Sequence, residues 1–507
     1  MDVYLSAVTE VFTLSNVFFV MLGIFIGYIV GAIPGLGKVT AAAIAIPLTF
    51  SMNPVTAIGF LVGISKGSTA GNAVSAILIN TPGEPSSVPT ALDGYPLARQ
   101  GKGIKALKVA LIASTIGDFV ATWVLIFLTG PLSRLAMQVG LVELASLLIF
   151  SLTFIAALSG KSLSKGLMSG LFGLLLATIG LEPETGTTRL IFGFRQLYDG
   201  PSLVAMAIGM VAIAEMIVQF EDIFMRKNDG ESVEDPEATA EDNQVTAEDW
   251  KKMWRPITGG TLIGTFIGIL PGLGASIASF ASYGLAQRLS KTPELFGKGN
   301  VEGIAAAESA DNAIIPSSLV PLVALGIPGS AIAAILAAGF AIHGMIPGPL
   351  MIRENPQFIL GMYGTMLLAS PLMLVIGWIG MRFFIRVISI PITYLLSAVF
   401  FFSVLGSYLE GGRQFGVYIM IIFGLVGYFV KRYDYSFVTF LIGFIIGRPL
   451  ELAIRQSIIV TRGESITEYP IAIFFATLTV IVMLRMVWST IRRIVKEREE
   501  QGAKSTG

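Results

Sequence analysis

Long apolar segments recur along almost the whole chain, and they constrain its fold more than any other feature. A helix needs about 20 apolar residues, within a range of about 17 to 25, to cross a hydrocarbon core of about 30 Å. Six segments fall in or near that range: 17–33, 107–129, 141–158, 202–220, 358–381 and 471–488. Their apolar residues run continuously or with a helical period, unlike the alternating strands of an outer-membrane barrel. The sequence therefore predicts an all-α polytopic membrane protein with about 11–14 helical segments, broken or re-entrant helices included.

The composition excludes several other classes of protein. Charged residues make up only 13% of the 507 residues, against about 25% in an ordinary soluble protein. The chain has no cysteine and a single histidine, His343, which excludes disulfides, thiolate metal sites and a multi-histidine centre. With zero formal net charge and no basic stripe, nucleic acid is not an expected partner. GASIAS does not satisfy the G-x-S-x-G pattern of serine hydrolases, so we expect a non-enzyme without a cofactor.

Charged residues are concentrated where they can set the orientation of the helices. The stretch 221–256 is acidic in the middle and basic at both edges, and the tail 492–507 is rich in Lys and Arg. The positive-inside rule predicts that both are cytoplasmic. The first 33 residues contain no Lys or Arg, so they predict a retained first span with the N-terminus outside. The acidic loop divides the chain into two membrane regions, 1–220 and 257–491.

Two motifs occur in the same order in both membrane regions. VGAIPGLG at 30–37 recurs as IGILPGLG at 267–274, and ILINTPGE at 77–84 is echoed by VALGIPGS at 323–330. Because the first span starts outside and its counterpart starts inside, the two regions are predicted to be inverted-topology repeats. Such repeats are typical of secondary transporters, whose binding site lies near the midplane where broken helices meet.

The Pro-Gly pairs in these motifs predict breaks in membrane helices. A break frees backbone groups that protein or a water-lined cavity must satisfy. The helix that restarts there points its N–H groups and positive dipole end at the cavity, and an anion is the natural ligand. The alternative interpretation is that the glycines only allow close helix packing, as small residues often do in membranes.

PGLGKVT, at 34–40, resembles part of a phosphate-binding loop but does not complete one. The pattern G-x-x-x-x-G-K-[ST] fails at Ala32 and Val39. The second copy has Ala275 in place of Lys38. The glycines are therefore the repeated feature, and the lysine is interpreted as local.

Compact polar residues lie around the breaks in otherwise apolar sequence, and they suit carboxylate oxygens or a sodium ion. The predicted substrate-binding residues are Gly35, Gly37, Lys66, Ser68, Thr69, Asn72, Asn80, Thr81, Gly83, Gly272, Gly274, Ser309, Asn312, Gly329 and Ser330. The coupling-ion candidates are Asp311, Ser317 and Ser318.

Several segments together resemble one family. They are PGLG near the first span, ILINTPGEPSSVPTALDGYPLARQGKGIKAL, and then PGLG, SKTPELFGKG, ESADNA, LVALGIPGS and IPGP in the second region. Over about residues 15–450 the chain resembles the TctA family, the large permease subunit of tripartite tricarboxylate transporters. The resemblance implies a multi-pass carrier of the bacterial or archaeal inner membrane that works with a small membrane subunit and an extracytoplasmic solute-binding protein. It also implies uptake of a small di- or tricarboxylate, driven by Na⁺ or H⁺. A stand-alone organic-anion carrier, or an anion channel that needs no binding protein, is the alternative.

The chain departs from the family pattern at three polar positions. Lys66 stands where an aromatic residue is usual, Asn72 where glycine is usual, and Asp311 where a second asparagine is usual. An unpaired charge in the bilayer is costly, so we predict that Lys66 and Asp311 face each other across the repeat interface. A snorkelling Lys66, or one that contacts the substrate carboxylate, is the alternative.

Two further acidic residues are singled out by their location. Asp118 lies within an apolar span and is a functional candidate for that reason. Asp93, in TALDGYPLARQG, is predicted to lie in a turn and to cap a helix beside a basic cluster, in a gating or structural role.

Overall fold

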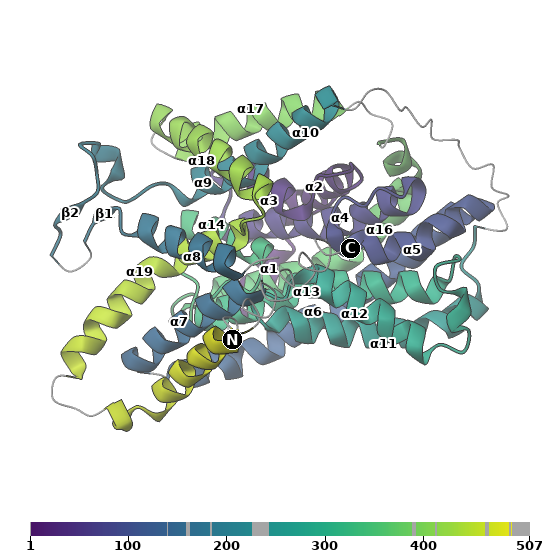
Figure 1. Cartoon of the computed structure of the whole chain (residues 1–507). Helices are drawn as coiled ribbons and strands as arrows, with labels where there is room; N and C mark the ends of the chain where they lie inside the picture. The colour runs from purple at the N-terminus through teal and green to yellow at the C-terminus, as the bar shows by residue number, and fades with distance from the viewer. Residues whose placement is uncertain are drawn as a thin grey trace, which may run out of the picture. The chain divides into compact units, whose positions relative to one another are not determined.

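The computed structural model describes residues 2–138, 140–158, 163–182, 185–225, 243–387, 392–410, 413–461, 466–485 and 488. These residues are mostly helical, with one small antiparallel pair of strands, β1 (Gly180–Leu181) and β2 (Thr188–Arg189) (Figure 1). The chain forms two compact units, which are described separately. Unit 1 comprises residues 1–136 and 201–431, and unit 2 comprises residues 137–200 and 432–507.

Unit 1 holds most of the helices. They are α1 (Asp2–Val11), α2 (Leu14–Gly31), α3 (Lys38–Ala45), α4 (Pro54–Ile79), α5 (Val88–Leu97), α6 (Gly103–Ala136), α9 (Leu203–Ile208), α10 (Ala214–Met225), α11 (Ala247–Ile269), α12 (Gly274–Leu289), α13 (Val301–Leu325), α14 (Ala331–Ile342), α15 (Met351–Glu354), α16 (Pro356–Val387), α17 (Ile392–Glu410) and α18 (Gln414–Arg432). Unit 2 contains α7 (Leu141–Leu158), α8 (Leu163–Ala177), the two strands, α19 (Phe437–Val460) and a helix at 470–485.

Six helical stretches of the described chain are long and apolar enough to cross a membrane. They are Leu14–Gly31, Pro85–Ala136, Leu203–Glu221, Pro356–Val387, Gln414–Arg432 and Phe437–Ile459. The predicted all-α polytopic membrane protein is confirmed. Residues 226–242 of the predicted acidic loop and the predicted tail 492–507 lie outside the described residues.

Two helices, α4 and α13, form the buried centre of unit 1. Nearly every residue of each is buried, although both carry Ser, Asn and charged side chains that would be costly against lipid. Helices α2 and α16 pack on α4, while α6, α11 and α12 pack on α13, as the lower part of Figure 1 shows for α13. The surrounding helices therefore shield two polar helices from the bilayer.

Glycines spaced four residues apart let neighbouring helices approach this centre. They are Gly23, Gly27 and Gly31 on α2, which face α4, and Gly260, Gly264 and Gly268 on α11, which face α13. A Cβ at any of them would collide with the facing helix, as expected where small residues set a helix interface. Each series ends three residues before a Pro-Gly pair. The close-packing interpretation therefore fits these glycines, and the two halves repeat the packing as well as the breaks.

The predicted helix breaks are present, and a helix begins at or just after each one. Helices α3 and α12 start at the two PGLG motifs, α14 starts after IPGS, and α5 follows TPGE through the short 3₁₀ helix η2 (Pro85–Ser87). Gly35 and Gly272 take φ values of 82° and 90°, a region that favours glycine because it has no Cβ. Four helix starts are thereby placed next to backbone that has left the helical path.

Each of the two predicted repeats contributes residues to both units. The first gives residues 1–136 and 201–220 to unit 1 and 137–200 to unit 2, and the second gives residues up to 431 to unit 1 and the rest to unit 2. The division into inverted repeats at the acidic loop stays a prediction.

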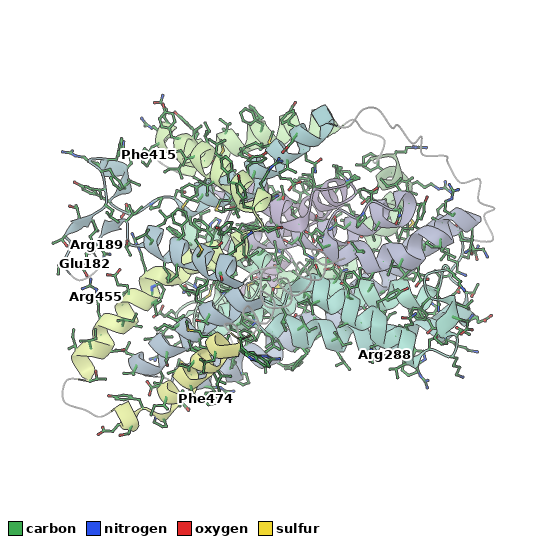
Figure 2. The ribbon with its side chains drawn as sticks, in the orientation of Figure 1. Glu182, Arg189, Arg288, Phe415, Arg455 and Phe474 are labelled. Atoms are coloured by element: carbon green, nitrogen blue, oxygen red, sulfur yellow. The ribbon has the colours of Figure 1, made fainter. Side chains whose placement is uncertain are left out.

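In unit 2, charged side chains connect the strands to α19. Arg189 donates to the two carboxylate oxygens of Glu451 at 2.7 and 3.0 Å, and this hydrogen bonding raises the pKa of Arg189. Arg455 lies 3.5 Å from Glu182, and Figure 2 shows both of them near Arg189. This network holds the hairpin to the helix and includes none of the predicted site residues.

Candidate functional site

A carboxylate joins the first two helix breaks. Glu84, directly after the second break, accepts a hydrogen bond from the backbone nitrogen of Lys38 at 2.7 Å. Its Oε2 lies 3.2 Å from Lys38 Nζ. Glu84 therefore contacts the first N–H group of α3 and the lysine side chain together, where the start of a helix attracts negative charge. A Cβ at Gly37 would collide with this carboxylate.

Lys38 also reaches into the second half of the chain. Its Nζ lies 2.9 Å from Asp311 Oδ1 on α13, and the two side chains are only 6% and 1% exposed. The other oxygen, Asp311 Oδ2, is buried and has no hydrogen-bond partner among the described residues. Because buried polar atoms normally have partners, this oxygen is available to a donor or a cation.

Glu308 lies one turn before Asp311 on α13 and is 1% exposed. Its Oε1 accepts from Thr90 Oγ1 at 2.7 Å, and its Oε2 accepts from Ser114 Oγ at 2.9 Å. Asn312 Nδ2 donates to Ser114 Oγ at 2.8 Å. Helices α5, α6 and α13 are thus connected around this carboxyl group.

Four ionisable side chains are therefore close together, and we call Lys38, Glu84, Glu308 and Asp311 the Lys38 cluster. Glu308 interacts electrostatically with both Asp311 and Lys38. The cluster contains three carboxyl groups and one lysine, so its net charge is −2 when all four groups are ionised.

Unsatisfied polar atoms lie beside the first breaks and on α13. Ser68 Oγ, both polar side-chain atoms of Asn72 and Asn312 Oδ1 are buried without a partner among the described residues. Asn72 Oδ1 lies against Gly83, and the backbone of Ser68 lies against Gly31 at the end of α2. Several predicted binding residues therefore offer free donors or acceptors where the helix is broken.

The second pair of breaks is also joined, but without charge. The backbone nitrogen of Gly272 donates to the carbonyl of Gly329 at 3.0 Å. Ser330 caps α14 by accepting from the nitrogen of Ala333, and its hydroxyl donates to Ser318 Oγ at 3.0 Å. Where the first pair has Lys38 and Glu84, the second has Ala275 and Ser330.

The predicted pairing of Lys66 with Asp311 is wrong. Lys66 Nζ lies 2.6 Å from Asp118 Oδ2 and also donates to the carbonyl of Met366 at 2.7 Å and to Ser370 Oγ at 3.1 Å. These contacts satisfy all three donors of an ammonium group. Lys66 and Asp118 are both fully buried, so Lys66 is not a snorkelling residue, and Asp311 pairs with Lys38 instead.

The remaining predicted residues serve local backbone contacts or lie away from the Lys38 cluster. Thr69, Ser309 and Ser317 donate to carbonyls of their own helices, as does Ser318. Asn80 ends α4 in the left-handed conformation, with a φ of 51°, and is exposed together with Thr81. Gly274 has open space around it. None of these contacts tests whether the residues bind a substrate or an ion.

Asp93 lies inside α5, and not in a turn as predicted from the sequence. Its Oδ1 accepts from the backbone nitrogens of Gly297, Gly299 and Asn300 at 2.8–3.0 Å, and its Oδ2 accepts from Tyr283 at 2.9 Å. The carboxylate therefore orders the PELFGKGN segment that leads into α13, which is a structural role on a different helix from its own.

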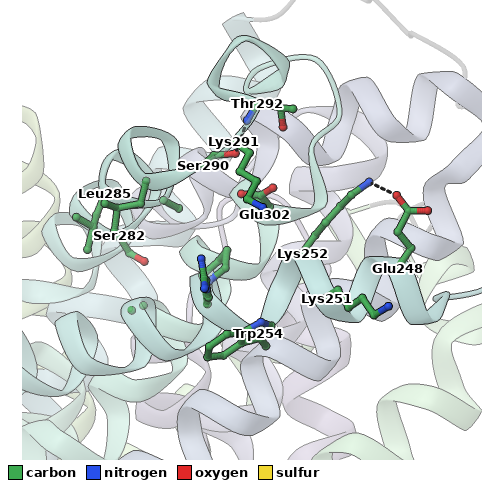
Figure 3. A pocket seen from close by; sticks show the side chains of 16 residues that line it. Glu248, Lys251, Lys252, Trp254, Ser282, Leu285, Ser290, Lys291, Thr292 and Glu302 are labelled. Atoms are coloured by element: carbon green, nitrogen blue, oxygen red, sulfur yellow. Dashed lines mark hydrogen bonds and ion pairs between the residues drawn. The ribbon is translucent and has the colours of Figure 1, made fainter.

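A pocket of about 670 Å³ opens in unit 1 between the start of α11 and the end of α12. Figure 3 shows Trp254, Lys251 and Lys291 among its lining residues, and the ion pair of Lys252 with Glu248 at 2.8 Å. Its lining residues include none of the Pro-Gly breaks and none of the Lys38 cluster.

Sequence reasoning missed Lys38, Glu84 and Glu308. Lys38 was interpreted as local because the second repeat has alanine there. Glu84 and Glu308 occur in the quoted motifs, but neither was predicted to be a site residue. The sequence did contain a signal. Lys38 directly follows the second glycine of PGLG, and Glu84 directly follows the glycine of the TPG motif. A charge at such a position stands next to the N–H groups of a new helix.

Comparison with known proteins gives a consistent result. Residues 17–442 match the model of the tripartite tricarboxylate transporter TctA family. The chain is 34% identical over 450 residues to an uncharacterized 52.8 kDa protein in the TAR-I ttuC′ 3′ region of Agrobacterium vitis, covering 89% of this chain and 88% of that one. It is 35% identical over 202 residues to an uncharacterized protein in the TAR-II ttuC′ 3′ region of the same organism, covering 40% and 84%. No solved structure matches the chain.

Proposed function

The chain belongs to the tripartite tricarboxylate transporter TctA family, and from this premise we propose that it takes up small di- or tricarboxylates across the inner membrane. Membership makes it a large, multi-pass membrane subunit of such a transporter. In our proposal, an extracytoplasmic solute-binding protein delivers the substrate, a small membrane subunit assists, and a Na⁺ or H⁺ gradient drives uptake. The N-terminus lies outside and the C-terminus lies in the cytoplasm.

One observation carries the proposed substrate site. A carboxylate of the chain itself, that of Glu84, is held by the backbone nitrogen and the ammonium group of Lys38. A positive helix start and a lysine are suitable partners for a carboxylate. We propose that a substrate carboxylate takes the place of Glu84 there during transport.

Polar groups nearby suit the rest of such a substrate. Ser68 Oγ and Asn72 Nδ2 are buried hydrogen-bond donors without partners among the described residues. A substrate that satisfied them would recover the free energy lost by leaving buried donors unpaired. The start of α14, capped only by Ser330, offers a second positive helix end. Together these groups favour an anion with several carboxylates.

Uptake into vesicles tests the proposal. Purified protein with its small subunit is reconstituted, and labelled citrate, tartrate and succinate are offered with and without a candidate binding protein, under sodium or proton gradients. We expect uptake only with the binding protein and a gradient. Equal uptake without the binding protein would favour the stand-alone carrier or channel, and no uptake of any carboxylate would reject the proposed substrate class.

A further inference from the structure

We propose that Glu308 is the residue that carries the coupling proton. This inference rests on the proposed function, because it names the group through which a proton gradient would act on carboxylate uptake. The coupling-ion candidates read from the sequence, Asp311, Ser317 and Ser318, do not include it.

The pairing of charges in the Lys38 cluster leaves Glu308 without a cation. Lys38 Nζ lies 2.9 Å from Asp311 and 3.2 Å from Glu84. In the part of the chain that the structure describes, no ion pair includes Glu308, and its side chain contacts the polar groups of Thr90, Ser114 and the nearby Asn312. An ionised carboxylate that is 1% exposed and has no cation is costly in a membrane protein. A proton on Glu308 removes that cost and reduces the charge of the cluster from −2 to −1.

The hydrogen bonds around Glu308 accept either protonation state. Ser114 Oγ receives a hydrogen from Asn312, so its own hydrogen points to Glu308 Oε2. Thr90 has no such constraint. Its hydroxyl donates to Oε1 when Glu308 is ionised and accepts from Oε1–H when Glu308 is protonated, at the same 2.7 Å separation of the oxygens. The proton can therefore be bound and released without rearranging the backbone.

Other ionisable groups on the elements packed around α13 are already engaged. Asp118 on α6 pairs with Lys66 on α4, and Asp93 on α5 accepts from Tyr283 on α12. Tyr28 on α2 donates to a backbone carbonyl of α16. Helix α11 carries its charges at 248–255: Asp249 pairs with Lys105, and the others line the pocket that also includes Glu302 at the start of α13. Among the described residues of these helices, Glu308 is thus the buried carboxyl group that has neither a cation paired with it nor several backbone N–H groups donating to it.

The position of Glu308 couples it to the proposed substrate site. Glu308 interacts electrostatically with Lys38 and Asp311, and Lys38 holds the carboxylate that the substrate would replace. A proton on Glu308 reduces the negative charge facing Lys38 and so favours binding of an anion. Release of the proton to the cytoplasm restores the negative charge and expels the substrate on that side. The reaction is a simple transfer, with one proton entering from outside and leaving inside.

The test compares Glu308→Gln with Glu302→Gln in reconstituted vesicles. Glutamine resembles a permanently protonated glutamate, whereas Glu302 lies on the same helix near its start, away from the Lys38 cluster. In the wild type and in Glu302→Gln, we expect an inward proton gradient to drive accumulation above the external concentration. In Glu308→Gln we expect complete loss of that accumulation, while exchange of internal for external substrate continues and no longer changes with pH.

Two outcomes would overturn the inference. One is proton-driven accumulation by Glu308→Gln, and the other is wild-type accumulation that follows a sodium gradient and ignores a proton gradient. Both leave the proposed carboxylate uptake standing, whereas a wild type that moves no carboxylate defeats the proposed function itself.

A measurement on the wild-type protein covers the case in which Glu308→Gln does not fold. A hydrophobic carbodiimide reacts with protonated buried carboxyl groups, and mass spectrometry locates the product. We expect labelling of Glu308 that decreases as the pH is raised and when substrate uptake is turning over. Absence of label on Glu308 at every pH would contradict the proposal.

Discussion

Two buried lysines, Lys66 and Lys38, differ in their place on a helix and in how their ammonium groups are satisfied. Lys66 sits in the middle of a continuous helix, and its three donors are satisfied by Asp118, Ser370 and a backbone carbonyl. Lys38 sits at the start of a helix that follows a break, and one of its carboxylate partners, Asp311, keeps a free oxygen. Asp118 also keeps one oxygen, Oδ1, without a partner among the described residues, so the difference lies in the ammonium groups. All three donors of Lys66 are used within the chain, whereas Lys38 Nζ contacts two carboxylates, Asp311 and Glu84. Burial of a charge therefore does not by itself mark a transport site.

The difference between the two ammonium groups has a structural cause. Lys66 joins three helices, because its partners lie on α6 and α16 while it belongs to α4. Lys38 joins two breaks and α13. A break exposes backbone N–H groups that a carboxylate can share, whereas an unbroken helix exposes none. The same residue type thus stabilises packing in one place and remains open to exchange in the other.

The largest effect is expected from breaking the pair of Lys66 and Asp118. Lys66→Met leaves Asp118 buried without its cation, and Asp118→Asn leaves the lysine unpaired. Removing one partner of a buried pair costs about 3–5 kcal/mol, so each single variant should lose much of its thermal stability in detergent. The double variant Lys66→Met/Asp118→Asn should be more stable than either single one. A double variant no better than the worse single variant would show that the two side chains are not coupled.

The next effect concerns function more than stability. Lys38→Met removes the cation proposed to bind a substrate carboxylate. Because a charge-assisted hydrogen bond is worth about 1.5–3 kcal/mol, substrate affinity should fall by about 10- to 100-fold. Binding of labelled carboxylate to the purified protein measures this loss, with the exposed Lys298→Met as the matched control. Unchanged affinity would place the site elsewhere.

A smaller effect, of opposite sign, is expected at the partner of Lys38. Glu84→Gln removes the internal carboxylate that competes with the substrate. Freeing a site from such a competitor should raise affinity by a modest factor, about three- to tenfold, while transport slows because release is less favoured. Equilibrium binding and uptake rates measured on the same preparation check both parts. A loss of affinity would mean that Glu84 helps to form the site and does not compete for it.

The smallest effect belongs to a pair near water. Asp249 caps α11 through Thr246 and lies 2.8 Å from Lys105. Burial raises the pKa of Asp249, but the hydrogen bonds from Lys105 and Thr246 outweigh it and the pKa is lowered. Its stabilising contribution is therefore present above the unfolded pKa of about 3.9 and is lost as the pH falls through the lower folded value.

Asp249→Asn should cost about 1 kcal/mol at neutral pH, as the loss of a cap does. The difference in melting temperature from the wild type should shrink in acid. Glu248→Gln, which affects only a pair of exposed side chains, is the control and should change little. A difference that stayed constant with pH would contradict the role of the Asp249 carboxylate.

Several parts of the fold and the site could be predicted from sequence, for identifiable reasons. The membrane class followed from apolar runs, because the bilayer requires a fixed length of apolar helix. The breaks followed from Pro-Gly pairs, because these residues cannot continue a helix without leaving backbone groups unpaired. Asn72 and Asn312 were singled out as polar residues in apolar surroundings, and the structure leaves polar atoms of both unsatisfied.

The partners of the charges could not be predicted in the same way. The sequence offered Lys66 and Asp311 as two unusual charges, and pairing them was reasonable until Asp118 and Lys38 were seen beside them. The sequence separation between partners is 52 residues for Lys66 and Asp118 and 273 for Lys38 and Asp311. No local pattern connects residues so far apart.

The sequence by itself thus determined that the chain is helical, membrane-embedded, internally repeated and broken at Pro-Gly motifs, because each of these properties can be read from the residue types of short segments. Only the tertiary structure decided which carboxylates pair with Lys66 and Lys38, and which carboxyl group is left without a cation. Those properties depend on how α4, α6 and α13 pack. Ion pairs form between side chains on neighbouring helices. The packing of glycines against facing backbones determines which of these side chains lie within contact distance.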